Sequence, residues 1–504
     1  MAIINSLFTW FLKKRMHQIE LFIKYPHDVQ EEWFHSLLST AEATEWGKKY
    51  DYKSILTPDE FKRRVPIQDY DSLKGYVDRM IKGEQNVLWP SEIKWFAKSS
   101  GTTADRSKFI PVSLEALEQC HFQGGKDMLT IYCHNRPNNK IFNGKSVVLG
   151  GSSQINNFSS DSYYGDLSSI LLRNLPFWAE SKRTPTLAIT LNPNFEEKIE
   201  TIAQITSKED VTSLAGVPTW NVVMAKRILE ITGKDNLLEV WPNLEFYGHG
   251  GVSFKPYVEQ FKKLIPSDNM YYLENYNASE GYFGIQDMSN SDDLLLMLDY
   301  GIYYEFLPTE FIGQENPKTL GLDEVEIGKN YALIISTNGG LWRYMIGDTI
   351  KFTTKSPYRF QITGRTKQYI NTFGEELIVD NADVAIKRAC LETSAIVKDY
   401  TAGPVYFKEK EAGAHEWIIE FEQDPTDFNQ FCQTLDNTLR EINSDYDAKR
   451  FKNMALNFPI IHNASKGTFY NWMKSRGKLG GQNKVPRLSN DRYYIDQILN
   501  LSKN

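Results

Sequence analysis

The amino-terminal part of the chain shows helical hydrophobic periodicity. From Ile19 to about Tyr52, apolar side chains recur at the spacing of one face of an α-helix. The preceding segment MAIINSLFTWFLKKRMHQIELF carries its basic residues after the apolar run and has no small-residue cleavage site, so we interpret it as an amphipathic helix. The apolar stripe predicted to enter the core consists of Leu21, Phe22, Tyr25, Trp33, Phe34, Leu37 and Leu38.

Further along, short strand-like segments alternate with helical ones. PTLAIT, VTSLAGV and LEFYGHGG are predicted strands, and each precedes an amphipathic segment, whereas SSDSYYGDLSS is predicted to be a loop. Residues 294–352 are β-rich in character. Such alternation is typical of α/β proteins with parallel strand pairing. The predicted fold class is therefore α/β, with mixed sheets and helices in a large amino-terminal domain.

The character of the chain changes at Gly364 and Arg365. The sequence GRTK interrupts two apolar strands there, and the stretch that follows contains a predicted helix, DNADVAIKRAC, and a predicted strand, HEWIIEFEQ. Its length of roughly 140 residues is normal for a domain. We therefore predict a large domain at residues 1–364 and a smaller α/β domain at residues 365–504.

Composition and charge narrow the class of protein. A chain of 504 residues exceeds what one hydrophobic core usually supports, and its net charge of −7 argues against a nucleic-acid partner. Cys120, Cys133, Cys390 and Cys432 have no CxxC pairing, as expected for reduced thiols in the cytoplasm. Beyond the amino terminus, no segment reaches the ~18 apolar residues of a membrane span. We expect a cytoplasmic protein without a membrane partner, and we favour a monomer.

The segment SSGTTADRSKFIPVS is a candidate phosphate-binding loop. Small polar residues can wrap a phosphate with their backbone N–H groups and hydroxyls, and Lys108 adds a positive charge. The preceding EIKWFAK predicts a strand, and SLEALEQC predicts a capped helix. Because neither GxxxxGK[ST] nor GxGxxG is present here, a polar surface turn fits the segment equally well. The candidate residues are Ser99, Ser100, Gly101, Thr102, Thr103 and Lys108.

Four later positions could carry related chemistry. Glu280 follows the predicted strand YYLENY and could hold Mg²⁺ on a nucleotide, or it could be a solvated carboxylate in a turn. Asp348 could meet a ribose diol or close a hairpin. Arg343 is either a phosphate or carboxylate partner or a surface residue. Lys484, in GKLGGQNKVPR, could reach a phosphate or lie in a flexible basic loop.

Taken together, SSGTTADRSK, YNASEG, LWRYMIGD and QNKVPR resemble the motifs of the auxin-responsive acyl acid amido synthetases, which are best known from plants and belong to the adenylate-forming ligases. The resemblance covers nearly the whole chain. It implies an ATP- and Mg²⁺-dependent ligase that adenylates a small carboxylic acid and transfers the acyl group to the amine of an amino acid, releasing AMP. Two alternatives stay open: an acyl-CoA synthetase-type ligase, and a nucleotide-binding module that has lost turnover.

The resemblance also implies roles for the matching residues. Tyr276 would lie near the adenine, and Lys108 and Ser279 would lie with it in the nucleotide site. The turn that holds the ATP phosphates would consist of Ser99, Ser100, Gly101, Thr102 and Thr103.

The remaining matches concern catalysis and domain movement. Glu280 would be catalytic and near Mg²⁺, and Asp348 would bind the ribose. Arg365 would contact the nucleotide and, with Lys367, form the hinge between a large ATP- and acyl-binding domain and a mobile small domain. That small domain would bring the catalytic Lys484 to the α-phosphate.

The sequence departs from the plant pattern at two places. It also suggests, less specifically, which residues could form the acyl pocket. Asp105 replaces a common glycine, and Glu375-Glu376-Leu377 replaces an Asp-Lys-Thr run. Gly250 and Gly251 end a predicted strand, where α/β sheets bind ligands, although a bare turn fits equally. Residues that could line the pocket, or serve ordinary packing, are Val217, Trp220, Tyr163, Tyr164, Gly250 and Gly251.

Overall fold

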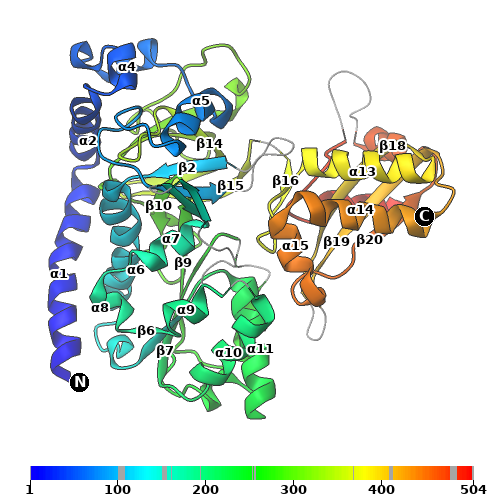
Figure 1. Cartoon of the computed structure of the whole chain (residues 1–504), viewed down its shortest axis with the longest axis horizontal. Helices are drawn as coiled ribbons and strands as arrows, with labels where there is room; N and C mark the ends of the chain where they lie inside the picture. The colour runs from blue at the N-terminus through cyan, green and yellow to red at the C-terminus, as the bar shows by residue number, and fades with distance from the viewer. Residues whose placement is uncertain are drawn as a thin grey trace. The chain divides into compact units, whose positions relative to one another are not determined.

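The computed structural model describes residues 2–99, 108–149, 156–159, 162–192, 194–252, 254, 257–366, 368–407, 412–476 and 485–501. They form two compact units (Figure 1). The large unit comprises residues 1–99, 108–251 and 261–366, and the small unit contains residues 252–260 and 367–504. Both units mix helices and sheets, which confirms the predicted α/β class with a large amino-terminal and a smaller carboxy-terminal part.

The amino-terminal segment is helical, as predicted. Arg15 in α1 donates a hydrogen bond of 2.6 Å to Asp127 in α6, which holds α1 along α6. The predicted burial of Leu21 and Tyr25 is wrong: their side chains are 55% and 44% exposed, because α1 ends and α2 begins between Lys24 and Pro26, which interrupts the stripe. The first helices are α1 (Ala2–Lys24), α2 (Pro26–Ala41), α3 (Glu45–Lys49), α4 (Pro58–Arg64) and α5 (Tyr70–Ile81).

None of the helices in the described part of the chain combines the length and the apolar character that crossing a membrane requires.

The described part of the large unit is built on an 11-stranded sheet with the order β12-β13-β14-β15-β11-β10-β9-β8-β7-β3-β6. Strands β6, β3, β7, β8 and β9 pair in parallel, and the strands from β9 to β12 pair antiparallel. The parallel strands are β3 (Lys145–Val148), β6 (Arg183–Thr184), β7 (Val211–Ala215), β8 (Phe246–Gly250) and β9 (Tyr271–Ala278). The others are β10 (Gly281–Ile285), β11 (Leu294–Leu296), β12 (Ile302–Pro308), β13 (Asn330–Thr337), β14 (Tyr344–Lys355) and β15 (Tyr358–Arg365).

A second sheet of the large unit has the order β2-β1-β5-β4. Its strands are β1 (Trp95–Ser99), β2 (Lys108–Val112), β4 (Asn156–Ser159) and β5 (Ser162–Gly165). The remaining helices of the chain as far as residue 264 are the π-helix η2 (Ala116–His121), α6 (Phe122–Asn135), α7 (Leu167–Arg173), α8 (Phe177–Glu180), α9 (Leu187–Thr190), α10 (Phe195–Thr206), α11 (Pro218–Thr232) and α12 (Val258–Leu264), besides short 3₁₀ turns.

Two predicted elements of the large unit are wrong. PTLAIT was expected to be a strand but contains the helix α9, because Pro185 lacks the N–H that a strand ladder needs and Thr186 takes the position before the helix. The predicted loop SSDSYYGDLSS contains strand β5, in which Tyr163 and Tyr164 pair with Trp95 and Phe96 of β1. Aromatic residues favour strands when a partner strand is available, and the sequence did not reveal that partner.

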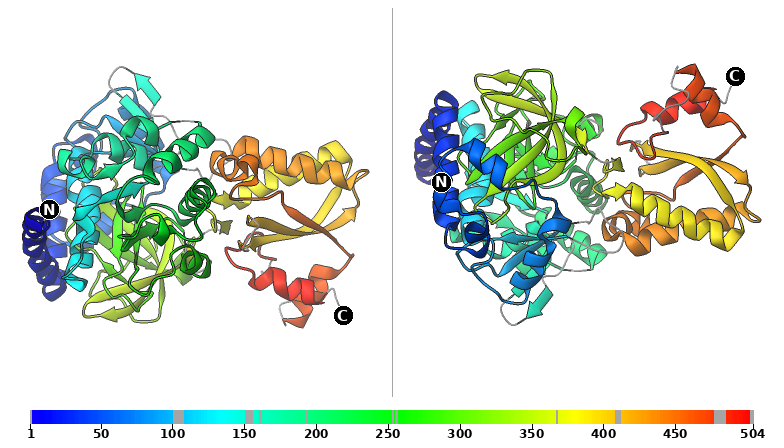
Figure 2. Two further views of the ribbon diagram at one scale, coloured as in Figure 1. Left: turned by 90° about the horizontal axis from the view of Figure 1, so that it is seen from below. Right: turned by 90° about the horizontal axis from the view of Figure 1, so that it is seen from above.

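The small unit has three layers in its described residues. Its sheet has the order β18-β19-β20, and Figure 2 shows helices on both faces of it. Trp417 and Ile419 of β19 point into the core with α13 and α14, and Ile418 points into the core with α16 and α17. The elements are β16 (Tyr369–Ile370), β17 (Leu377–Ile378), α13 (Val379–Thr393), β18 (Ile396–Val405), β19 (Ala414–Gln423), α14 (Phe428–Ile442), α15 (Ser444–Arg450), β20 (Ile460–Ala464), α16 (Thr468–Ser475) and α17 (Tyr493–Leu501).

Candidate functional site

The carboxylate of Asp348 is held by two of the residues that the sequence motifs singled out. Tyr276 Oη donates a hydrogen bond of 2.5 Å to Asp348 Oδ2, and Arg365 Nε donates one of 2.7 Å to Asp348 Oδ1. Asp348 lies inside β14, opposite Arg365 of β15, and its side chain is buried. The alternative that Asp348 closes a hairpin is therefore wrong.

Tyr276 is fixed by packing as well as by its hydroxyl. Its ring is buried, with the centroid 4.9 Å from that of Phe283. Burial, together with the negative charge of Asp348, raises the pKa of Tyr276 well above its ordinary value. The phenol therefore stays protonated and donates to Asp348 across the usual range of pH.

Glu280 lies in the two-residue turn between β9 and β10, beside Ser279. Burial raises the pKa of Glu280, and the charge of Asp348 acts in the same direction, whereas the positive charges of Lys108 and Arg365 act against it. Lys108, Asp348 and Arg365 therefore all act electrostatically on Glu280, and a bound cation there would favour its ionised carboxylate.

Ser99 and Lys108 face each other at the ends of β1 and β2. The segment before the candidate phosphate loop is a strand, as predicted. Ser113 Oγ accepts a hydrogen bond of 2.9 Å from Ala116 N, which confirms the predicted cap, although the first helical turns have π geometry. The remaining residues predicted for the loop, hinge and lysine motif lie outside the described residues; they are Ser100, Gly101, Thr102, Thr103, Asp105, Lys367 and Lys484.

Two of the residues suggested for the acyl pocket lie side by side, Gly251 after the end of β8 and Val217 at the start of α11. Gly251 has φ of 82°, which favours glycine, and a Cβ there would lie 3.5 Å from Val217 Cγ2. Trp220 lies one turn along α11 and is 9% exposed. A Cβ on Gly250 would meet the carbonyl oxygen of Asn275 at 2.5 Å, so only glycine fits this strand end.

Tyr163 and Tyr164 lie in the second sheet and have packing partners there. The ring of Tyr163 lies 5.2 Å from that of Trp95, and the ring of Tyr164 stacks on Phe158 at 4.2 Å. These contacts support the packing alternative for both tyrosines.

Arg343 is neither exposed nor available to a ligand. Its guanidinium is buried and binds Glu305, with an Nη2 to Oε2 distance of 2.8 Å. Nη1 donates to the carbonyl oxygens of Lys62 and Val65, and Nη2 also donates to Thr319 Oγ1. Arg343 therefore pairs with a carboxylate of the protein itself. A carboxylate partner was one of the alternatives that the sequence left open for this residue.

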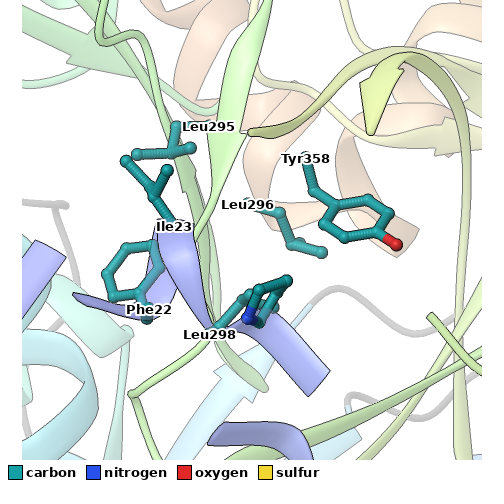
Figure 3. A pocket seen from close by; sticks show the side chains of 7 residues that line it. Phe22, Ile23, Leu295, Leu296, Leu298 and Tyr358 are labelled. Atoms are coloured by element: carbon teal, nitrogen blue, oxygen red, sulfur yellow. The ribbon is translucent and has the colours of Figure 1, made fainter. Parts of the chain in front are cut away.

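A small, mostly apolar pocket elsewhere in the large unit offers few groups for binding or catalysis. Figure 3 shows its lining, in which the tyrosine hydroxyl is the single polar side-chain group. The lining residues are Phe22, Ile23, Pro26, Leu295, Leu296, Leu298 and Tyr358. None of the predicted site residues belongs to this pocket.

Sequence reasoning missed Asn275, which lies immediately before the motif YNASEG. Its side-chain amide donates a hydrogen bond of 2.8 Å to the carbonyl oxygen of His249 at the end of β8. Strand alternation was a usable signal, because it places Asn275 and Tyr276 on opposite faces of β9.

The arrangement of the chain corresponds to an adenylate-forming ligase fold. Solved structures with this arrangement include the GH3.15 acyl acid amido synthetase, with a TM-score of 0.61 and 16% identity over 97% of this chain and 95% of that one. A 2-hydroxyisobutyryl-CoA ligase in complex with 2-HIB-AMP and CoA has a TM-score of 0.59 and 12% identity over 95% and 92% of the two chains. At these identities the likeness establishes the fold.

The chain belongs to the GH3 family. Residues 15–270 match the GH3 family N-terminal domain, residues 295–365 the central domain and residues 380–493 the C-terminal domain. Relatives include the indole-3-acetic acid-amido synthetase GH3.3 of Arabidopsis thaliana, 24% identical over 94% of this chain and 91% of the relative. The jasmonoyl-L-amino acid synthetase JAR6 of Nicotiana attenuata is 23% identical over 94% and 93% of the two chains. The family suggested by the four motifs is thereby confirmed.

Proposed function

We propose that this protein is an ATP-dependent acyl acid amido synthetase. It adenylates a small carboxylic acid and transfers the acyl group to the amine of an amino acid. The observation that carries the proposal is the buried Asp348 carboxylate, which Tyr276 and Arg365 orient within the same field as Glu280 and Lys108. Membership of a family whose relatives bear the names of amido synthetases supports it.

In this proposal Asp348 binds the ribose of ATP. Among the described residues, each of its oxygens accepts one hydrogen bond, and a carboxylate offers about four acceptor sites, which leaves acceptors for a ribose diol. Ser99 and Lys108, with the loop residues Ser100 to Thr103 and with Ser279, hold the phosphates. Tyr276 orients Asp348 through its hydrogen bond and lies near the adenine.

The described residues fit a magnesium ion that arrives with ATP. They contain no group of three or more His, Cys, Asp or Glu side chains placed to hold a metal. Mg²⁺ usually binds one or two carboxylates together with substrate phosphates and waters, and the Glu280 carboxylate beside Lys108 suits that mode. Bound Mg²⁺ would supply charge neutralisation on the phosphates.

The chemistry has two half-reactions. In the first, a carboxylate oxygen of the acid attacks the α-phosphorus of ATP, the bond to the β-phosphate oxygen breaks, and pyrophosphate leaves. Lys484 and the N–H groups of the phosphate loop stabilise the added negative charge. In the second, the amine attacks the acyl carbon, loses a proton to solvent, and expels AMP. The anhydride supplies the activation, so no protein nucleophile is required.

Residues 1–364 act in this proposal as the ATP- and acyl-binding domain, and residues 365–504 as a mobile domain that carries Lys484. Rotation about Arg365 and Lys367 would serve the two half-reactions in turn. The acyl group would lie near Gly250, Gly251 and Val217. We also propose that the protein is a monomer and that it is cytoplasmic. The four cysteines, all of which are described, are free thiols, which supports the proposed compartment.

A ligase that uses the thiol of coenzyme A as acceptor is the alternative. The fold it would need is the same, as the similarity to a CoA ligase illustrates. The identity of the nucleophile that consumes the adenylate therefore has to be tested by activity.

The test of the catalytic assignment is Lys484→Ala, assayed by exchange of labelled pyrophosphate into ATP in the presence of an accepted acid. Removing the ammonium group should reduce exchange by about 100-fold or more while ATP binding, measured by calorimetry, changes little. Lys329→Ala removes an exposed lysine of the large unit and should leave exchange unchanged. Unchanged exchange in Lys484→Ala would contradict the role of this lysine.

A further inference from the structure

Asn275 places a polar side chain at the ligand-binding edge of the large sheet. Strands β8 and β9 are parallel, and Gly250 pairs with Asn275, so the carboxyl ends of both strands meet at one edge. Ligands of α/β proteins bind at such edges. A Cβ on Gly250 would lie 2.8 Å from Asn275 Oδ1, so the Asn275 amide extends over the glycine, on the face opposite Tyr276.

The orientation of this amide is fixed. Asn275 Nδ2 donates to the His249 carbonyl oxygen at 2.8 Å and lies 3.7 Å from Met128 Sδ. Because a carbonyl oxygen can only accept, the nitrogen of the amide must face His249, and the oxygen must point the other way. Within the described ranges of the chain, no donor reaches Asn275 Oδ1. The half-buried strand end therefore presents an oriented hydrogen-bond acceptor.

The side chain beside the Asn275 amide nitrogen is apolar, and the residue beneath the amide oxygen is a glycine. A Cβ on Gly248 would lie 2.7 Å from Met128 Sδ, so the methionine of α6 lies directly on Gly248 of β8. A thioether adapts to irregular apolar shapes. An apolar wall with one oriented acceptor is the arrangement that recognises an apolar molecule carrying one donor.

We propose that Asn275 is a specificity residue and that the preferred acid carries a hydroxyl or N–H group that donates to Asn275 Oδ1. This inference rests on the proposed function, because it assumes that the molecule bound at this edge is the acid to be adenylated. An acid with a methyl group in place of the donor would take water away from Oδ1 without replacing its hydrogen bond, which disfavours binding.

The experiment compares matched acids that differ by hydroxyl against methyl. The pairs are 3-hydroxybenzoate with 3-methylbenzoate, 4-hydroxybenzoate with 4-methylbenzoate, and 3-hydroxybutanoate with 3-methylbutanoate. We expect kcat/KM for pyrophosphate release to favour the hydroxyl member by about tenfold in at least one pair. Asn275→Ala should reduce that preference to about twofold or less, since the acceptor is gone. Asn243→Ala, which removes an exposed amide of the same unit, should retain it.

A methyl preference in every pair, or a hydroxyl preference that survives in Asn275→Ala, would overturn the proposal. If Asn275→Ala does not fold, Asn275→Ser is used in its place, and the wild-type comparison stands on its own. If no acid is adenylated, the proposed function fails. Calorimetry of the same pairs with the wild-type protein and ATP then decides the inference, because equal binding within every pair contradicts it and tighter binding of a hydroxyl member supports it.

Discussion

At the scale of single residues, Arg343 illustrates how a buried charge can organise a site without touching a ligand. The N–H groups of its guanidinium bond to Glu305, to Thr319 and to the carbonyl oxygens of Lys62 and Val65. Its backbone has a positive φ of 44° at the start of β14, the strand that carries Asp348. The arginine therefore connects the carboxyl-terminal end of α4 to the strand that carries Asp348, the candidate ribose-binding residue.

Replacing Arg343 with lysine should destabilise the protein by about 3 kcal/mol, because an ammonium group cannot satisfy the same set of acceptors and leaves the buried Glu305 carboxylate poorly paired. The free energy of unfolding in urea measures this effect. Arg388→Lys, at an exposed pair with Glu441, should change it by less than about 0.5 kcal/mol. Equal effects of the two substitutions would contradict the structural role of Arg343.

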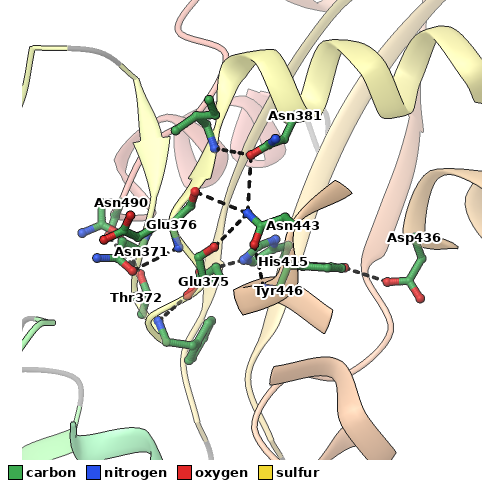
Figure 4. Close-up of polar contacts among 12 residues, drawn as sticks. Asn371, Thr372, Glu375, Glu376, Asn381, His415, Asp436, Asn443, Tyr446 and Asn490 are labelled. Atoms are coloured by element: carbon green, nitrogen blue, oxygen red, sulfur yellow. Dashed lines mark hydrogen bonds and ion pairs between the residues drawn. The ribbon is translucent and has the colours of Figure 1, made fainter. Parts of the chain in front are cut away.

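At the scale of elements, the structure explains the Glu375-Glu376 sequence, which differs from the pattern of the plant enzymes. Glu375 is fully buried, and its Oε1 lies 2.8 Å from His415 Nε2 on β19, while its Oε2 accepts from Phe373 N at 2.7 Å (Figure 4). Asn443 Nδ2 also donates to the carbonyl oxygen of Glu375 at 3.0 Å. The carboxylate thus fastens the segment before β17 to the sheet of the small unit.

Replacing Glu375 alone should lower the free energy of unfolding more than replacing both Glu375 and His415. Glu375→Leu should destabilise the protein by about 3 kcal/mol, since His415 and Phe373 N lose a buried acceptor. The double variant Glu375→Leu/His415→Leu should recover part of that stability. A double-mutant cycle of unfolding free energies measures the recovery as a coupling free energy. The control Glu441→Leu removes an exposed carboxylate and should have little effect. Strictly additive effects in the cycle would show that the two side chains do not act as a pair.

The sequence predicted elements well where local pattern and tertiary environment agree. Strands β7, β8 and β9 and helix α13 were predicted from the local sequence pattern alone. Strand β5 was not, because its pairing with β1 joins segments far apart in the chain. The pair of Glu375 and His415 was beyond reach for the same reason, since 40 residues separate its members.

At the scale of the whole molecule, motifs scattered along the sequence converge in the large unit. Asp348 and Arg365 come from the neighbouring strands β14 and β15, so their contact follows from sheet order. Tyr276 comes from β9 and still donates to Asp348, although β15, β11 and β10 lie between β9 and β14 in the sheet. The family resemblance anticipated these three residues. It did not anticipate the acceptor of Asn275, because motif matching does not report which face of a strand a residue occupies.

The stability of the whole protein should depend on pH through a buried histidine of the large unit. Burial lowers the pKa of His121 to about 4. Between that pH and the unfolded value of about 6.5, the unfolded chain binds a proton that the folded protein does not, so stability falls as the pH falls. From pH 7 to pH 5 this histidine should contribute a loss of about 2 kcal/mol.

The variant His121→Gln should therefore show a smaller loss of unfolding free energy between pH 7 and pH 5 than the wild type, by about 2 kcal/mol. Urea unfolding at the two pH values measures it. His134→Gln removes an exposed histidine and should leave the wild-type difference intact. If His121→Gln had the same pH dependence of stability as the wild type, His121 could not be the source of the predicted loss.

The central claim is that the chain activates an acid with ATP and passes it to an amino acid. The most direct measurement is pyrophosphate release from ATP and Mg²⁺ across aromatic and aliphatic acids, each alone, with mixed amino acids and with coenzyme A. We predict release that requires an acid and rises with amino acids, with the amide product identified by mass spectrometry. Stimulation by coenzyme A alone, with formation of a thioester, would contradict the claim.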